Sequence, residues 1–275
     1  MNKYVFHTDH LSEQQQAFIQ TQFSQVAKQL DGFYSLESDE PVDLAVIRQQ
    51  LDCDVNQLPA NFKGNQVRLL VTDMDSTLIS IECIDEIADM LGIKPQVSAI
   101  TEAAMRGELD FAESLTQRVA LLKGLPESDL QRVYDERLSL NPGAEQLIAH
   151  LKQSSVKLAL VSGGFTFFTN KLKQRLGLDY TLANTLEVKD GCLTGQVEGD
   201  IIGAQAKADL LQQLSAELSL QPEQVIAMGD GANDLLMMDI AGLSVAYHAK
   251  PTVQAQTHTQ LNQTGLDAVI ALLKA

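Results

Sequence analysis

From residue 66 onward, short apolar runs alternate with longer stretches of helical periodicity. The runs at 67–72, 156–161, 224–228 and 243–247 have the length of strands and few polar residues. Runs of this kind are typical of parallel strands that are buried on both faces. Helical patterns lie between and after them, at 143–153, 167–176, 204–218 and 235–241. This alternation predicts an α/β fold, with a doubly wound and mostly parallel sheet.

The segment between the first two strands breaks this alternation. Residues 84–91, 95–106, 111–123 and 127–138 have the pattern of four successive helices, and Gly92, Gly107 and Gly124 stand where helices can end. We therefore expect residues 66–80 and 142–275 to form a catalytic core. Residues 81–141 should form a helical cap over the carboxyl edge of the sheet, where open α/β sheets bind ligands.

Residues 1–65 follow neither pattern. A helical stripe is visible over 11–30 and a second short one over 43–51, and Pro59, Asn61 and Gly64 indicate a linker. We expect a small N-terminal extension, whose role the sequence leaves open.

The charge balance narrows the classes of partner. The chain has 20 basic and 36 acidic residues, a net charge of −16, which disfavours a nucleic-acid-binding face or a surface that docks on anionic lipid.

No apolar run approaches the roughly 20 residues of a transmembrane helix, and the first residues lack the apolar core of a signal peptide. The three cysteines are far apart and form no metal or disulfide pattern. We expect a cytoplasmic monomer or homodimer that binds a small molecule.

Acidic clusters follow two of the predicted strands. Asp73 and Asp75 come directly after the first strand, and Asp230 and Asp234 follow the third. Each cluster alone could be a turn or a helix cap. Because the carboxyl ends of parallel strands meet at one edge, the four carboxylates should converge and repel one another. A hard divalent cation relieves this repulsion, so the two clusters together predict a Mg²⁺ site.

Two further features suit an anion. Ser162, Gly163 and Gly164 follow the second strand, and glycines allow backbone N–H groups to approach an anion closely. Lys207 lies on the helix before the third strand. In isolation, the first is an ordinary turn and the second an ordinary solvated lysine.

Taken in order, VTDMDST, VSGG, Lys207 and GDGANDLLM resemble the four motifs of the haloacid dehalogenase superfamily of phosphotransferases. The segments IECIDEI, AAMRGELDF, SGGFTFF and AYHAKP are similar to the phosphoserine phosphatases of that superfamily, and the resemblance spans residues 66–270. It implies a Rossmann-type core and Mg²⁺-dependent hydrolysis of O-phospho-L-serine to L-serine and phosphate, the last step of serine biosynthesis. The reaction would pass through an aspartyl phosphate.

The resemblance also assigns roles. Asp73 would be the nucleophile, and Asp75 would act first as general acid and then as general base. Mg²⁺ would be held by Asp73, the backbone carbonyl of Asp75, Asp230 and Asp234. The transferred phosphoryl group would be contacted by Lys207, Ser162, Gly163 and Asn233.

Substrate selection is assigned to the cap. Glu82 would meet the substrate ammonium, Arg118 would pair with its carboxylate, and Met105 and Phe111 would close over the site. Without the resemblance, the four residues are most simply a solvated glutamate, a surface arginine and two core residues.

Two alternatives remain open at this stage. A related enzyme could act on another amino-acid or amine phosphate, such as phosphohomoserine or phosphoethanolamine, or could transfer the phosphoryl group to another alcohol. A regulatory protein could use the same pocket only to bind an amino acid or phosphate. The intact pair Asp73 and Asp75 disfavours pure binding, which needs no nucleophile.

Overall fold

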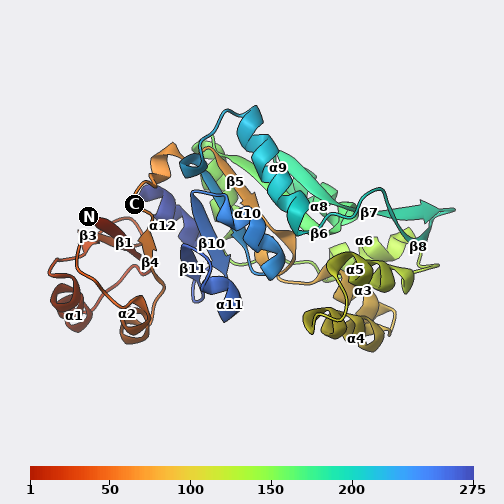
Figure 1. The fold of residues 1–275 in the computed structure, drawn as a ribbon, viewed down its shortest axis with the longest axis horizontal. Helices are drawn as coiled ribbons and strands as arrows, with labels where there is room; N and C mark the ends of the chain where they lie inside the picture. Colours follow the sequence, from red (N-terminus) through yellow and green to blue (C-terminus); the bar gives the residue numbers. More distant parts are fainter.

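The computed structural model describes all 275 residues, in three parts that follow one another across the molecule (Figure 1). A small N-terminal module, residues 2–58, lies at one end. The large sheet and its helices occupy the middle, and helices α3 to α6 lie at the other end. Both chain termini lie near the junction of the N-terminal module with the large sheet.

The large sheet has seven strands in the order β11-β10-β9-β5-β6-β7-β8. All neighbouring pairs are parallel except β7 and β8, which are antiparallel. This confirms the predicted doubly wound, mostly parallel sheet. The strands are β5 (Leu69–Thr72), β6 (Lys157–Phe165), β7 (Tyr180–Lys189), β8 (Cys192–Glu198), β9 (Val225–Gly229), β10 (Leu243–Tyr247) and β11 (Thr259–Leu261).

The central strands are buried on both faces, as their apolar composition predicts. Leu70 belongs to one hydrophobic cluster, whereas Leu69 and Val71 belong to another. Successive side chains of a strand point to opposite faces, so these clusters are the two sides of the sheet. The helices that follow the strands are α7 (Ala144–Gln153), α8 (Thr166–Leu176), α9 (Ala204–Glu217), α10 (Leu235–Asp239), α11 (Pro251–Gln254) and α12 (Val269–Lys274).

Three strands of this sheet have no counterpart in the sequence prediction. β7 and β8 form a hairpin at one edge, and β11 forms the other edge. Their side chains are partly exposed and mixed in polarity. They therefore lack the continuous apolar run by which the buried strands were predicted.

Four helices follow β5, as predicted: α3 (Cys83–Met90), α4 (Lys94–Met105), α5 (Phe111–Ala120) and α6 (Glu127–Glu136). A reciprocal capping box at Asp110 begins α5. The Asp110 carboxylate accepts from the N–H of Glu113 at 2.8 Å, and the Glu113 carboxylate accepts from the N–H of Asp110 at 3.0 Å. The β7–β8 hairpin contacts this helical block. Leu193 and Leu125 bond through their backbones at 2.8 Å.

The N-terminal module contains strands that the sequence analysis did not predict. Its elements are β1 (Asn2–Phe6), α1 (Glu13–Phe23), β2 (Lys28–Gln29), β3 (Tyr34–Ser38), α2 (Leu44–Leu51) and β4 (Val55–Leu58). The sheet is antiparallel, with the order β2-β3-β1-β4. The first helix ends at Phe23 rather than near residue 30, because Ser24 takes the left-handed conformation (φ 53°).

The module has its own core and is joined to the large sheet by buried polar contacts. Tyr4 and Phe23 pack edge to face with ring centroids 4.8 Å apart. The carboxylate of Asp54 accepts from the backbone N–H groups of Asn262 and Gln263 at 2.9 Å each. These contacts place β4 beside β11.

The chain also contains five short helical turns, at Gly64–Gln66, Met74–Leu78, Pro222–Gln224, Ala232–Asp234 and Leu266–Ala268. None of the helices combines the length and the apolar character needed to cross a bilayer.

Candidate active site

The end of β5 turns so that two aspartates face one pocket. Asp73 and Asp75 are both extended, at φ −68° and −65°, and Ser76 then takes a left-handed conformation at φ 55°. The N–H of Ile79 donates to the carbonyl of Met74 at 3.0 Å and closes the turn. A non-glycine residue in the left-handed region carries a conformational cost, which is typical of functional sites. Both carboxylates line a pocket of about 140 Å³.

The end of β6 meets Asp75 directly. The hydroxyl of Ser162 donates to Oδ2 of Asp75 at 3.2 Å and accepts from the N–H of Gly164 at 2.8 Å. A Cβ atom on Gly164 would lie 2.7 Å from Oδ2 of Asp75, and one on Gly163 would lie 2.8 Å from the Phe111 ring. Glycine is therefore required at both positions if the backbone is to approach the pocket this closely.

The end of β9 brings two more carboxylates to the same place. Thr77 donates to Oδ1 of Asp230 at 3.1 Å, and Oδ2 of Asp234 accepts from the N–H of Gly231 at 3.1 Å. Asp73, Asp230 and Asp234 each offer an oxygen within 4.8 Å of the other two. This set of hard oxygen donors fits Mg²⁺. The side chain of Asp75 lies outside this group.

Lys207 extends from α9 into the same cluster. Its side chain is fully buried, and its Nζ atom donates to Oδ1 of Asp73 and, at 2.7 Å, to Oδ1 of Asp234. Burial lowers the pKa of this ammonium, but Asp73 and Asp234 outweigh that effect and hold the pKa above its ordinary value. The alternative of a solvated surface lysine is therefore wrong.

The electrostatics of this cluster favour an additional cation. Burial raises the pKa of Asp73 and of Asp75 above the ordinary range, although Lys207 partly opposes the shift. Burial together with the neighbouring Asp234 raises the pKa of Asp230 to about 6. One ammonium does not compensate several buried carboxylates, and a divalent ion would favour their ionised forms.

Two charged residues of the segment 81–141 also line the pocket. Glu82 is exposed at the mouth of the pocket and accepts from the Ser76 hydroxyl at 2.6 Å. Partial desolvation of its carboxylate, together with the nearby Asp75, raises its pKa to about 7. Arg118 donates through Nε to the carbonyl of Ser114 at 3.3 Å and forms no salt bridge. Burial lowers its pKa. The pocket thus holds one acidic group, close to Asp75, and one basic group in addition to the aspartates.

The structure brings together all but three of the predicted site residues as pocket lining. The core contributes Asp73, Asp75, Ser162, Gly163, Asp230 and Asn233. The segment 81–141 contributes Glu82, Phe111 and Arg118. Lys207 and Asp234 lie buried behind them. Met105 is the last residue of α4, is 66% exposed and does not line the pocket.

Sequence reasoning missed three lining residues, Ile84, Leu115 and Phe165, whereas Gly164 had been singled out with Ser162 and Gly163 as suited to an anion. Leu115 could have been found, because Phe111, Leu115 and Arg118 are spaced at i, i+4 and i+7 and share one face of α5. Thr77 and Ser76, which orient Asp230 and Glu82, had no signal beyond their place beside Asp75.

The comparisons with known proteins agree with this geometry. The family model of haloacid dehalogenase-like hydrolases matches residues 70–239. A phosphoserine phosphatase of a Polaromonas strain is 52% identical over 225 residues, which are 80% of this chain and 95% of that protein. The chain belongs to the haloacid dehalogenase-like hydrolases. Within that family, relatives that are 49–54% identical to this chain are phosphoserine phosphatases.

Solved structures of this family match the whole fold, including the N-terminal module. A haloacid dehalogenase family hydrolase from Salmonella enterica superposes with a TM-score of 0.91 at 34% identity, covering 99% of this chain and 98% of its own. A probable phosphoserine phosphatase from Vibrio cholerae gives a TM-score of 0.85 at 38% identity, covering 99% of this chain and 86% of its own.

Proposed function

We propose that this protein hydrolyses O-phospho-L-serine to L-serine and phosphate, through an aspartyl phosphate on Asp73. The observation that carries the proposal is the joint presence of Asp73, Asp75, Glu82 and Arg118 in one pocket of about 140 Å³. That volume is below the usual 300–1,000 Å³ of drug-sized ligand pockets, so it suits a substrate of few atoms. An acidic and a basic residue match the ammonium and carboxylate of an amino acid.

In the first step, a carboxylate oxygen of Asp73 attacks phosphorus and the bond between phosphorus and the seryl oxygen breaks. The departing oxygen takes a proton from Asp75. The raised pKa of Asp75, caused by burial, supports this role as general acid. Ser162, the N–H of Gly163 and Asn233 are placed to contact the phosphoryl oxygens from the pocket wall.

In the second step, Asp75 takes a proton from water, and the water oxygen attacks phosphorus of the aspartyl phosphate. The bond to Asp73 breaks, and phosphate leaves with the regenerated carboxylate behind it. Lys207 holds Asp73 in place through its ammonium and balances part of the charge of Asp73 and Asp234. A buried ammonium fixed by two carboxylates is a positioned charge of the kind that phosphoryl transfer uses.

We propose Mg²⁺ as the metal, held by the side chains of Asp73, Asp230 and Asp234 and by the backbone carbonyl of Asp75. When bound, it would neutralise charge on the phosphoryl oxygens.

We further propose that residues 66–80 and 142–275 are the catalytic core, that 81–141 are the cap, and that 1–65 are an N-terminal part. The small-molecule partner would be O-phosphoserine, bound by a cytoplasmic monomer or homodimer. The free thiols of Cys53, Cys83 and Cys192 support a reducing compartment.

Steady-state kinetics on three esters test the substrate assignment. Phosphoethanolamine lacks the carboxylate that Arg118 would bind, and 3-phosphoglycerate replaces the ammonium that Glu82 would bind. We expect kcat/KM for each to be at least about 30-fold below that of phosphoserine, since a charge left without its partner in the bound complex costs about 2 kcal/mol or more.

Variants connect this selectivity to the cap. Arg118→Ala should reduce kcat/KM for phosphoserine and leave that for phosphoethanolamine nearly unchanged. Arg132→Ala, on the exposed face of α6, should alter neither value. Equal rates on phosphoserine and phosphoethanolamine in the wild type would contradict the role of Arg118 and favour an enzyme for amine phosphates.

A further inference from the structure

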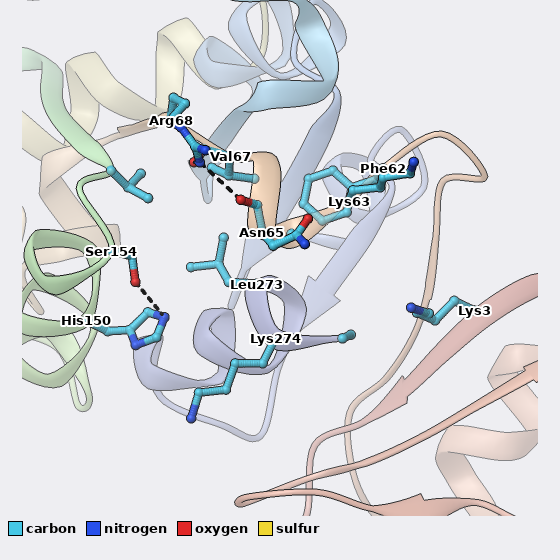
Figure 2. A pocket seen from close by; sticks show the side chains of 13 residues that line it. Lys3, Phe62, Lys63, Asn65, Val67, Arg68, His150, Ser154, Leu273 and Lys274 are labelled. Atoms are coloured by element: carbon cyan, nitrogen blue, oxygen red, sulfur yellow. Dashed lines mark hydrogen bonds between the residues drawn. The ribbon is translucent and has the colours of Figure 1, made fainter.

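A second cavity, of about 630 Å³, lies where the N-terminal module meets the core (Figure 2). Its walls come from four separate parts of the chain: strand β1, the connector at residues 62–68, the end of α7 and the C-terminal helix α12. None of these residues lines the active-site pocket.

The cavity is basic, although the protein is acidic. Lys3, Lys63, Arg68 and Lys274 line it, with His150, and no aspartate or glutamate side chain does. With 36 acidic residues in 275, an average group of 13 residues would contain about two. The local field is therefore opposite in sign to the net charge of −16.

Several of these cations are free to bind a ligand. Arg68 donates through Nη1 only to backbone carbonyls, of Asn65 at 3.1 Å and of Val67 at 2.7 Å (Figure 2). Lys63 is exposed and forms no salt bridge. Both Lys63 and Arg68 therefore lack a carboxylate partner, and a guanidinium held by its own backbone is positioned for an anion.

The other two lysines form weak ion pairs with exposed carboxylates, which a ligand would have to replace. Lys274 pairs with Asp31 at 3.0 Å, and Lys3 pairs with Glu37 at 3.7 Å. Asp31 is 91% exposed, and exposed ion pairs contribute little stability. A multivalent anion in the cavity could replace these partners at small cost.

The cavity lies at the amino ends of the strands of the large sheet, whereas the active site lies at their carboxyl ends. Arg68 immediately precedes β5 and Val156 immediately precedes β6, so both mark the amino ends of their strands. Asp73 follows the other end of β5. The four residues of that strand separate it from Arg68, which is five steps of about 3.3 Å, or about 16 Å. An occupant of the cavity would not touch the phosphoryl group at the catalytic centre.

We propose that this cavity binds a small organic anion that carries two or more phosphate or carboxylate groups. Its volume lies within the 300–1,000 Å³ that is usual for ligand pockets and admits a molecule up to the size of a nucleotide. Phe62, Val156 and Leu273 provide an apolar wall for the body of such a molecule. Because the ligand would contact Lys3 of the module and Arg68 and Lys274 of the core, its binding would stabilise their association.

Calorimetric titration and thermal unfolding test this proposal without any measurement of turnover. The probes are ATP for phosphate groups, citrate for carboxylates and inorganic phosphate as a single-centre anion, in magnesium-free buffer of constant ionic strength. We expect ATP or citrate to bind and to raise the unfolding temperature, and inorganic phosphate to bind at least tenfold more weakly.

A pair of double variants assigns the binding to this cavity. Lys63→Gln with Arg68→Gln should weaken binding of the tighter probe at least tenfold. Lys94→Gln with Arg132→Gln removes the same charge from the exposed surface of the cap and should leave the affinity within twofold of the wild type. Circular dichroism verifies that each variant folds. If the Lys63→Gln, Arg68→Gln variant does not fold, the single variant Lys63→Gln, at an exposed position, replaces it in the binding measurement.

Two results would overturn the proposal. One is the absence of measurable binding of ATP and citrate at millimolar concentration. The other is an equal loss, or no loss, of affinity in the two double variants, because that would assign the binding to general charge or to the active site. Phosphoserine turnover without the probes should be the same in both double variants, so failure of the proposed enzymatic function remains a separate result.

Discussion

The Nζ atom of Lys207 lies 2.7 Å from Oδ1 of Asp234, and both side chains are fully buried. The same ammonium also contacts Asp73. The two aspartates are far apart in the chain, and Lys207 holds them together at the base of the pocket. This relationship makes the lysine a structural neutraliser of the metal-binding carboxylates as well as a group near the reacting phosphoryl.

We predict that Lys207→Met lowers kcat by at least about 100-fold, the scale found when one positioned electrostatic group is lost. Like-charge repulsion between Asp73 and Asp234 should also increase, which should tighten the binding of Mg²⁺. Kinetics at saturating phosphoserine and a Mg²⁺ titration measure the two effects. Near-wild-type kcat in a folded Lys207→Met protein would exclude the catalytic role of the lysine.

We predict that Asp73→Asn abolishes turnover and leaves the protein folded, since an amide oxygen is a poor nucleophile. Phosphate release should fall by at least about 10⁴-fold, which is the scale of losing a nucleophile. Far-ultraviolet circular dichroism should match the wild type. Asp190→Asn is the matched control, because Asp190 is exposed in the β7–β8 turn. Turnover by Asp73→Asn at a near-wild-type rate would exclude Asp73 as the nucleophile.

Removal of divalent ions should inactivate the enzyme reversibly. With EDTA, the clustered carboxylates of Asp73, Asp230 and Asp234 would have only Lys207 to balance them. Activity should fall below about one hundredth, in keeping with the several kcal/mol that a metal contributes to phosphoryl transfer, and should return when Mg²⁺ is added in excess. Full activity after exhaustive metal removal would contradict the proposed site.

The N-terminal module should lose stability in acid through His7. Burial lowers the pKa of His7 to about 4, and its Nδ1 atom has no hydrogen-bond partner. Below pH 6.5, His7 is protonated in the unfolded chain, whereas in the folded protein it stays neutral until the pH falls to about 4. The stability contributed by neutral His7 is therefore complete above pH 6.5 and is lost as the pH falls towards 4.

Between pH 7.5 and pH 5, this group alone should cost about 2 kcal/mol of unfolding free energy. Urea unfolding at both pH values measures the loss in the wild type, in His7→Gln and in His10→Gln. His7→Gln should lose about 2 kcal/mol less than the wild type over this interval, whereas His10→Gln, at an exposed position, should behave as the wild type. An equal loss of unfolding free energy between pH 7.5 and pH 5 in all three proteins would show that His7 takes up no proton when the protein unfolds.

The predictable parts of this protein are those encoded by local patterns. β5, β6, β9 and β10 were found because strands buried on both faces are apolar at consecutive positions. The four helices α3 to α6 were found because their periodicity and stop residues are local. The motif residues at the strand ends were found because parallel strands bring their carboxyl ends to one side of the sheet. The strand order β9-β5-β6, which makes Asp73, Ser162 and Asp230 neighbours, came only from the structure.

Tertiary structure decided what depends on contacts between distant segments. The partly polar β7 and β8 form strands because they pair with each other and, through β7, with β6, and the strands of the N-terminal module are likewise defined by pairing. Lys207 is buried where it approaches two aspartates, and Met105, the last residue of α4, is left 66% exposed. The basic cavity gathers residues from 3 to 275, because only folding determines which charges of an acidic chain become neighbours.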